Sequence, residues 1–499
     1  MTHHDSHAIE SFEPSAVWRI FTGIAAVPRP SKKEQQIRSH VRRLAEEKKL
    51  QVREDSAGNL LIEVPASPGH EQAPVVVLQG HLDMVCEKNL NSNHDFEREG
   101  IKLRTEKTAN EEVFVRADGT TLGADNGIGV SLALAAATSP DVVHGPLEIL
   151  CTVDEEMGMS GAKALDPAFV RGRIMLNLDS EEDDTLYIGC AGGCDSNLAW
   201  EFEMSALGPQ TGTSEACIIR VGGLRGGHSG ADIHLNRANA IKVLVRALST
   251  PALRTLRLVE ISGGSKRNAI PRDAFAFVAG SRGTTEILRK AAQALQDELI
   301  RHSKEEGAKI EIESKPMPST ALTPKATRCV LATLRGLPHG VLAVVPDIPG
   351  LVQTSNSVST IVTEKLSGDN NVRLVIGCLA RSSADPELKT TIQQLAAVGE
   401  LAEAAVESGN DYPGWQPNVS SSLLKTCRQL YEQLFGTPPK VTAIHAGLEC
   451  GIIGQRMGGM DMISFGPHIT GAHSLEERVN VRSVQKSWSY LKKVLAALA

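Results

Sequence analysis

A buried strand is predicted at residues 74–85, which read PVVVLQGHLDMV. The apolar run ends at Gly80, and His81 and Asp83 follow it two positions apart. Since side chains alternate along a strand, His81 and Asp83 point to the same face where the strand meets solvent. Such a pair is either a metal ligand with a neighbouring carboxylate or a surface ion pair. The pair alone leaves both interpretations open.

Apolar strands that end in acids recur further along the chain. Residues 145–156 read GPLEILCTVDEE, and residues 171–182 read RGRIMLNLDSEE. Between them and the first strand, Asp125 and Asn126 stand at the start of an apolar helix, a usual place for capping groups. Strands that alternate with helices predict an α/β layered sheet.

The order of the predicted elements changes at about Leu198. A β-α-β-β-α-β succession follows, and elements of a second such round continue to about residue 400. This order predicts an inserted α+β domain at residues 198–400, built from two ferredoxin-like halves, although no sequence repeat supports the duplication. The α/β character then returns. The first domain is therefore expected to be discontinuous, residues 1–197 and 401–499, with a mixed sheet flanked by helices.

The bulk properties favour a soluble enzyme or binding protein over other classes. Of 499 residues, 41% are hydrophobic and 22% are charged, and the net charge of −7 argues against nucleic acid as a partner. No apolar stretch is long enough to span a bilayer, so no membrane partner is expected either. The start of the chain shows no secretory pattern, and nine scattered cysteines do not suggest a disulfide framework. We expect a cytoplasmic protein.

Acids and histidines gather at the ends of the predicted strands, and each has an ordinary explanation when taken singly. Asp125 can cap its helix, and Glu155 with Glu156 can form a solvated acidic turn. In open α/β sheets, however, ligands bind beyond the carboxyl ends of the strands. Together these donors favour a site for hard or borderline divalent cations. The set comprises His81, Asp83, Asp125, Glu155, Glu156, Asp179 and His473.

Seven motifs, spread over almost the whole chain, resemble the co-catalytic di-zinc peptidase family that includes aminoacylases and dipeptidases. They are GHLDMV, TTLGADNGIG, DEEMGMSG, LNLDSEE, GGHSGADIHLNRANA, HAGLECG and TGAHS. The resemblance implies a zinc-exopeptidase-like catalytic domain with the inserted domain as its lid. It also implies hydrolysis of unblocked dipeptides, preferentially Xaa-His dipeptides such as β-alanyl-histidine.

The resemblance further implies two divalent metal ions, zinc in the first place, with cobalt or manganese as alternatives. His81 and Asp179 would hold one metal, and Glu156 and His473 would hold the other. Asp125 would bridge both ions together with a water or hydroxide, and a cis peptide bond would follow Asp125. Two such ions polarise the scissile carbonyl and activate the water.

Catalytic and substrate-binding roles are carried over in the same way. Glu155 would be the general base, and Asp83 would accept a hydrogen bond from His81 and fix its tautomer. His228 in the lid would donate to the oxyanion of the tetrahedral intermediate. The residues implied to contact the substrate are Asn268, Arg381 and Glu449.

Other functions remain as alternatives at this point. The same metal set would serve a deacylase of N-acyl amino acids or an aminopeptidase that acts on longer peptides. A non-catalytic binding protein on this fold would be expected to lack a ligand or the base, and here all of these positions are filled. The expected partner is a small peptide substrate, with a homodimer as the oligomer considered.

Overall fold

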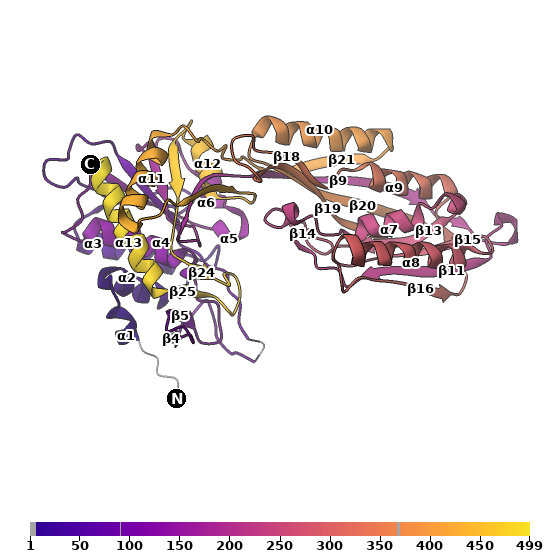
Figure 1. Ribbon diagram of the computed structural model, residues 1–499, viewed down its shortest axis with the longest axis horizontal. Coiled ribbons are helices and arrows are strands. Elements are labelled where there is room, and N and C mark those ends of the chain that lie inside the picture. The colour runs from indigo at the N-terminus through magenta and orange to yellow at the C-terminus, as the bar shows by residue number, and fades with distance from the viewer. Residues whose placement is uncertain (1–5, 90, 367–369) are drawn as a thin grey trace. The chain divides into compact units, whose positions relative to one another are not determined.

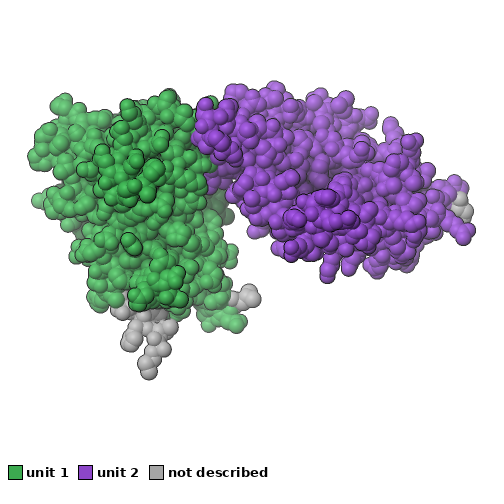
Figure 2. Space-filling model, viewed as in Figure 1, with its two compact units in different colours: residues 1–189, 415–443, 448–499 green, residues 190–414, 444–447 purple. Residues whose placement is uncertain are grey.

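The computed structural model describes residues 6–89, 91–366 and 370–499 (Figure 1). The chain divides into two compact units, coloured separately in Figure 2. Unit 1 contains Met1–Gly189, Trp415–Ala443 and Leu448–Ala499, and unit 2 contains Cys190–Gly414 and Ile444–Gly447. The expected domain limits fall inside strand β9 (Gly192–Glu203) and at the end of helix α10 (Asp385–Leu401). Both elements belong to unit 2, so its limits lie further out than the sequence pattern indicates.

Unit 1 is built on an eight-stranded sheet with the order β1-β2-β6-β3-β7-β23-β8-β22. Strand β3 pairs in parallel with β6 and β7, and β7 pairs in parallel with β23, whereas β1–β2, β2–β6 and β8–β23 are antiparallel. The sheet is therefore mixed, as predicted. Its strands are β1 (Gln51–Glu54), β2 (Leu60–Val64), β3 (Val76–His81), β6 (Leu147–Thr152), β7 (Ile174–Asn177), β8 (Thr185–Cys190), β22 (Lys440–Ile444) and β23 (Asp461–Ser464).

Helices cover the central strands of this sheet. Every residue of β3 and β6 is buried, as expected for continuous apolar strands in a layered α/β unit. Helix α4 packs against β3, and α2 packs against α4. The helices of unit 1 are α1 (Ser6–Glu10), α2 (Ser15–Ala25), α3 (Gln35–Glu47), α4 (Ala124–Thr138), α5 (Glu155–Gly158), α6 (Ser160–Ala164), α11 (Ser422–Phe435), α12 (Glu449–Arg456) and α13 (Val481–Leu498).

A second, four-stranded sheet in unit 1 has the order β24-β25-β5-β4. The pairing of β5 with β25 brings the chain that follows His473 beside the chain that precedes Asp125. This sheet is not predicted from the sequence, because its strands are short and partly polar. They are β4 (Leu103–Lys107), β5 (Val113–Ala117), β24 (Ile469–Thr470) and β25 (Arg478–Asn480).

Unit 2 contains a nine-stranded sheet with the order β16-β11-β15-β13-β19-β20-β9-β21, and β18 pairs with β19 beside this path. Its further strands are β11 (Glu215–Gly222), β13 (Arg257–Gly263), β15 (Ala274–Gly280), β16 (Lys309–Lys315), β18 (Gly340–Val344), β19 (Val352–Lys365), β20 (Asn371–Ser382) and β21 (Ala405–Tyr412). The further helices are α7 (Ala240–Leu248), α8 (Thr284–His302) and α9 (Pro324–Gly336). Short strands β12 (Gly227–His228) and β14 (Ala269–Ile270) pair with each other, as do β10 (Ser205–Ala206) and β17 (Thr320–Ala321).

The strand order shows how the two halves of unit 2 are nested. Strands β16-β11-β15-β13 with α7 and α8 form one β-α-β-β-α-β half, and β19-β20-β9-β21 with α9 and α10 form the other. The first half lies in the sequence between β9 and α9 of the second. The halves meet where β13 pairs with β19, at Gly263 and Ile361. Two ferredoxin-like halves are therefore present as predicted, although the opening strand of the second half precedes the first half in the chain.

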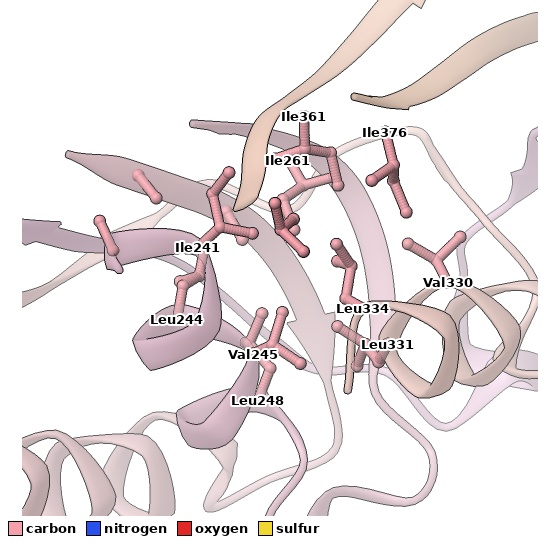
Figure 3. Packing of buried hydrophobic residues seen from close by; sticks show 14 of the residues in the cluster. Ile241, Leu244, Val245, Leu248, Ile261, Val330, Leu331, Leu334, Ile361 and Ile376 are labelled. Carbon is pink, nitrogen blue, oxygen red and sulfur yellow. The ribbon is translucent and has the colours of Figure 1, made fainter. Parts of the chain in front are cut away.

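The core of unit 2 lies between this sheet and a helical layer (Figure 3). Its α7 side chains follow the i, i+3, i+4, i+7 spacing of a helix face that is buried along its length. Burial of each such side chain contributes about 1.5–3 kcal/mol relative to exposure. The labelled residues are Ile241, Leu244, Val245 and Leu248 from α7, Val330, Leu331 and Leu334 from α9, and Ile261, Ile361 and Ile376 from the strands. Across the described part of the chain, no helix has the length and apolarity needed to cross a membrane.

Candidate active site

Parallel strands of unit 1 end together at the carboxyl edge of the sheet, and the predicted donors lie there. His81 is the last residue of β3, Glu155 and Glu156 follow β6, and Asp179 follows β7 by two residues. Asp125 lies in the first turn of α4. His473 has a φ of 63°, the left-handed region that few residues other than glycine adopt, in the loop after β24. All five predicted metal ligands come from unit 1.

Asp125 lies between the two histidines. Its Oδ1 is 3.0 Å from His81 Nε2, and its Oδ2 is 3.2 Å from His473 Nε2. His81 Nε2 is also 3.4 Å from Asp179 Oδ1, and His473 Nε2 is 3.0 Å from Glu156 Oε2. Each histidine therefore shares Asp125 and has one further carboxylate of its own. This is the arrangement that two adjacent cation positions with one shared ligand require.

Three overlapping groups of side chains could hold a metal ion, with their ligand atoms within 4.8 Å of one another. These groups are His81 with Asp125 and Asp179, Asp125 with Glu156 and His473, and His81 with Glu155 and Glu156. Asp179 Oδ1 and Glu156 Oε1 are buried without a hydrogen-bond partner among the described residues. Buried carboxylate oxygens of this kind are usually paired or bind a cation. The donor set of carboxylates and imidazoles fits zinc, cobalt or manganese.

Electrostatics at the cluster favour positive charge. Hydrogen bonds that His473 donates to Asp125 and Glu156, against the opposing effect of burial, raise the pKa of His473 to about 11. Burial raises the pKa of Asp179 to about 7, with repulsion from Asp125 adding to it and His81 opposing it. The carboxylates thus attract a proton or a cation strongly. A divalent ion bound there would replace the proton on each histidine.

Asp83 has a second role besides the predicted one. Its Oδ1 lies 3.4 Å from His81 Nδ1, consistent with the expected orientation of the imidazole. The same carboxylate accepts hydrogen bonds from the backbone N–H groups of Glu155 at 3.0 Å and Glu156 at 3.1 Å, and from Ser31 Oγ at 2.7 Å. Burial alone would raise the pKa of Asp83, but these bonds and His81 lower it to about 2. His81 Nδ1 lies closer to the Asp83 backbone carbonyl oxygen, at 3.1 Å, while the Asp83 carboxylate holds the turn that carries the two glutamates.

Glu155 belongs to a strongly acidic environment. Burial raises its pKa well above the usual value, and repulsion from Asp179, Glu449 and Glu156 adds to this, while His81 opposes it. A carboxylate with a raised pKa is a better proton acceptor near neutral pH.

Glu477 and Arg29, which the sequence analysis does not identify, fix the loop that carries Asp125. Glu477 is buried and accepts backbone hydrogen bonds from Leu122, Gly123, Ala124 and Asp125, at 2.7, 2.9, 2.8 and 3.3 Å. The buried Arg29 guanidinium donates to the carbonyls of Leu82 and Asp83, each at 2.9 Å, and to that of Gly123. In the sequence, Glu477 looks like part of a solvated charged run, and Arg29 has no local signal. The peptide bond between Asp125 and Asn126 is cis, as predicted.

Glu449 is the one predicted substrate contact that belongs to unit 1. It is fully buried at the start of α12, where its Oε2 accepts from Thr152 Oγ1 at 2.6 Å and Gln79 Nε2 at 2.7 Å. Gln79 in turn bonds to Asn177. Both partners lie on central strands of the sheet, so the Glu449 side chain is held within unit 1.

The remaining predicted residues lie together in unit 2. His228 ends β12 and Asn268 directly precedes β14, and the Ser229 N–H donates to the Asn268 carbonyl at 2.8 Å. His228 Nδ1 accepts hydrogen bonds from the backbone of Gly230 at 3.2 Å and Ala231 at 2.9 Å. Burial, with Arg381 second, lowers the pKa of His228 to about 4. The ring is therefore neutral, with Nδ1 as acceptor and Nε2–H available as donor.

Arg381 is a buried cation. Its side chain is 4% exposed, and its Nη1 donates to the phenol oxygen of Tyr412 at 2.8 Å. Within the part of the chain that the structure describes, Arg381 forms no ion pair, and its Nε has no hydrogen-bond partner. A buried guanidinium without a counterion is costly unless an anion binds to it.

The two-unit α/β fold and the clustered donors define a hydrolase of the metallopeptidase type, and comparison with known proteins gives its family. A family model described as peptidase family M20/M25/M40 matches residues 77–497. The chain belongs to this family and is a hydrolase that acts on peptide bonds. The predicted family resemblance is thereby confirmed.

Individual relatives match nearly the whole chain. The chain is 39% identical over 492 residues to the cytosol non-specific dipeptidase of Escherichia coli (strain K12), with 98% of each sequence covered. The solved structure of aminoacylhistidine dipeptidase from Vibrio alginolyticus is similar at 38% identity, with a TM-score of 0.87 over 98% of both chains. A tripeptidase from Staphylococcus aureus, at 14% identity and a TM-score of 0.58, shares the fold over 98% of this chain. The predicted fold class is confirmed.

Proposed function

We propose that this protein is a cytoplasmic dipeptidase that depends on two divalent metal ions and hydrolyses unblocked dipeptides. The observation that carries the proposal is Asp125 between His81 and His473, each with a further carboxylate of its own. The names of the two relatives support dipeptide substrates and, for one of them, a cytosolic location. Unit 1 would be the catalytic domain, and unit 2 would supply groups that bind the substrate.

The geometry of the cluster supports the following assignment of metal ligands. His81 and Asp179 would hold one ion, Glu156 and His473 the other, and Asp125 both, with zinc as the first choice and cobalt or manganese as alternatives. When bound, the ions would polarise the scissile carbonyl and lower the pKa of a water. Asp83 would keep His81 in the ligating tautomer and hold the backbone of Glu156 in place.

Proton transfer and substrate binding use other side chains. Glu155 would take a proton from water and deliver it to the leaving amine, as its raised pKa favours. The Nε2–H of His228 would donate to the developing oxyanion. Arg381 would bind the C-terminal carboxylate of the substrate, since a guanidinium fork matches a carboxylate. Asn268, which is exposed, would contact the substrate backbone.

A panel of substrates tests the proposal. Purified protein loaded with Zn²⁺, Co²⁺ or Mn²⁺ would be assayed with Xaa-His dipeptides including β-alanyl-histidine, other dipeptides, dipeptide amides and N-acetyl amino acids. We expect dipeptides with free termini to be cleaved, the Xaa-His set most efficiently, and the amides poorly. Equal or faster cleavage of N-acetyl amino acids would establish the deacylase alternative instead. Uniform cleavage of all dipeptides would contradict only the Xaa-His preference.

A further inference from the structure

Arg381 lies in a row of residues that crosses four neighbouring strands of unit 2. In β20, Arg381 is opposite Ser355 of β19 on one side and Gly193 of β9 on the other. Gly193 is in turn opposite Tyr412 of β21. Residues that are directly opposite one another in a sheet project to the same face. Arg381 and Tyr412 therefore flank Gly193 on one face of the sheet.

Tyr412 reaches Arg381 across the strand between them. Strands β20 and β21 are two strand spacings apart, roughly 10 Å. The Tyr412 side chain lies over β9, and its hydroxyl oxygen accepts a hydrogen bond from Arg381 Nη1 at 2.8 Å. The register of β21 shifts between Gly409 and Tyr412, which sets Tyr412 opposite Gly193. The contact therefore depends on the register of the sheet and does not arise from neighbours in the sequence.

Gly193 has no side chain, and this allows the Tyr412 side chain to lie over β9 and reach Arg381. A Cβ atom at Gly193 would lie 2.6 Å from the Tyr412 hydroxyl oxygen, 2.8 Å from Cζ and 2.9 Å from Cε1. All three distances are too short for real contacts, and the atoms belong to a rigid ring. Any other residue at 193 would push the phenol away from Arg381.

The chemistry of the contact leaves the charge of Arg381 intact. Burial raises the pKa of Tyr412, and Arg381 opposes this only in part, so the phenol is neutral. The neutral phenol oxygen accepts one of the five N–H donors of the guanidinium and so can orient this group without neutralising its charge. A carboxylate in the same place would form an ion pair with the guanidinium. The other rings near Arg381, His228 and His445, are also neutral, since burial and Arg381 lower the pKa of His445 to about 3.

We propose that Tyr412, lying across Gly193, is a positioning residue that orients the Arg381 guanidinium to bind the C-terminal carboxylate of the substrate. The inference rests on the proposed function and extends it to a residue that contacts no substrate itself. If Tyr412 acts through Arg381, it should affect the binding of substrates that have a negatively charged C-terminus and not of those that lack this charge.

The test compares Tyr412→Phe with the parent on one dipeptide and on its C-terminal amide. For the free dipeptide, KM should rise about tenfold with kcat nearly unchanged, as for the loss of one hydrogen bond to a charged group used equally in binding and turnover. For the amide, KM should not change. Gly193→Ala should reproduce this pattern. In the Arg381→Met background, Tyr412→Phe should have no further effect, because the two residues act as one unit.

Tyr490→Phe provides a matched control. Tyr490 is a buried tyrosine of unit 1 whose hydroxyl donates to the Cys427 carbonyl at 2.9 Å. The control should lose similar stability on urea unfolding without a change in KM. If Tyr412→Phe leaves KM for the free dipeptide unchanged, or raises it equally for the amide, the positioning role is wrong. If the parent itself cleaves the amide as well as the free dipeptide, the carboxylate role of Arg381 in the proposed function is wrong as well.

Discussion

Glu155 and Glu156 are adjacent in sequence, and the proposed function gives their carboxylates different roles. Both glutamates group with His81, but Glu156 Oε2 also lies 3.0 Å from His473, and burial raises the pKa of Glu155 well above its usual value. Glu155→Gln keeps the shape and cannot accept a proton, so kcat should fall by about 10²–10⁴ while metal content stays at the parent value. Glu156→Gln should lower the metal content, and added metal should partly restore activity.

Metal content after gel filtration, measured beside kcat, separates these two roles. Turnover of Glu155→Gln near the parent rate would show that this carboxylate is not the base. Loss of metal from Glu155→Gln but not from Glu156→Gln would show that Glu155 is the metal ligand and Glu156 the base. An acidic turn without function predicts little effect from either change, within about 0.5 kcal/mol of stability.

His228 offers a second prediction at the scale of one residue. Its neutral ring has Nε2–H available, so His228→Ala removes one oxyanion donor, and kcat should fall by about 10²–10³. Metal content should not change, because the ligand cluster lies wholly in unit 1. The exposed His234 of the same unit gives the control His234→Ala, which should keep the parent kcat. Metal loss in His228→Ala would contradict the donor role.

At the scale of elements, the loop before α4 depends on a carboxylate that is distant in sequence. Glu477 accepts hydrogen bonds from four successive backbone N–H groups, the last of them that of Asp125. In Glu477→Gln, one carboxylate oxygen is replaced by an NH2 group, which cannot accept hydrogen bonds from the backbone N–H groups. The free energy of unfolding should therefore fall by about 1–3 kcal/mol. Metal affinity should fall about 10–100-fold, since the ligand Asp125 is no longer held. Urea unfolding and metal titration measure the two effects. Glu476→Gln, at an exposed neighbour, should change neither, and an unchanged affinity in Glu477→Gln would contradict the positioning role.

The segment Ile444–Gly447 gives a pH-dependent prediction for unit 2. His445 Nε2 is 2.7 Å from Ser355 Oγ, and burial followed by Arg381 lowers the pKa of His445 to about 3. In the unfolded chain this pKa is about 6.5, so the unfolded state binds the proton first as the pH falls. The stability is fully present above about pH 6.5 and is lost progressively toward about pH 3. His445→Gln should show a smaller decline than the parent in urea unfolding between pH 7 and pH 4. Parallel declines would mean that His445 is not buried in the neutral form.

At the scale of the whole molecule, the sequence predicts those features that depend on local order. The position of His81 and Asp83 after an apolar strand, and of Asp179 after another, places them at one sheet edge because parallel strands end together. The roles of Glu477 and Arg29 could not be predicted in this way. Glu477 reaches Leu122 across 355 positions, and Arg29 reaches Gly123 across 94, so no local pattern records either contact.

The architecture of unit 2 shows the same limit. The elements of its first half follow one another in the sequence in the order β-α-β-β-α-β. In the second half, the opening strand β9 is separated from α9 by the whole first half. The contact of Tyr412 with Arg381 depends on the resulting order β20-β9-β21. A nested topology therefore places chemically important neighbours where only the complete sheet reveals them.

The division into two units predicts where metal binding stabilises the chain. The five proposed ligands come from five separate segments, all in unit 1, so the two bound ions together would link β3, α4 and the loops after β6, β7 and β24. An ion that binds only the folded form adds about 2.7 kcal/mol at a concentration 100 times its Kd. Hydrogen exchange of metal-stripped protein, with and without Zn²⁺, should therefore show added protection in peptides that cover β3, β6 and the start of α4. Peptides from β11 and β15 should exchange at unchanged rates, since unit 2 contributes none of the proposed ligands.

Asp125→Ala should abolish the added protection, because it removes the one carboxylate that both metal positions share. Equal protection of both units, or none in unit 1, would contradict the assignment of the metal site.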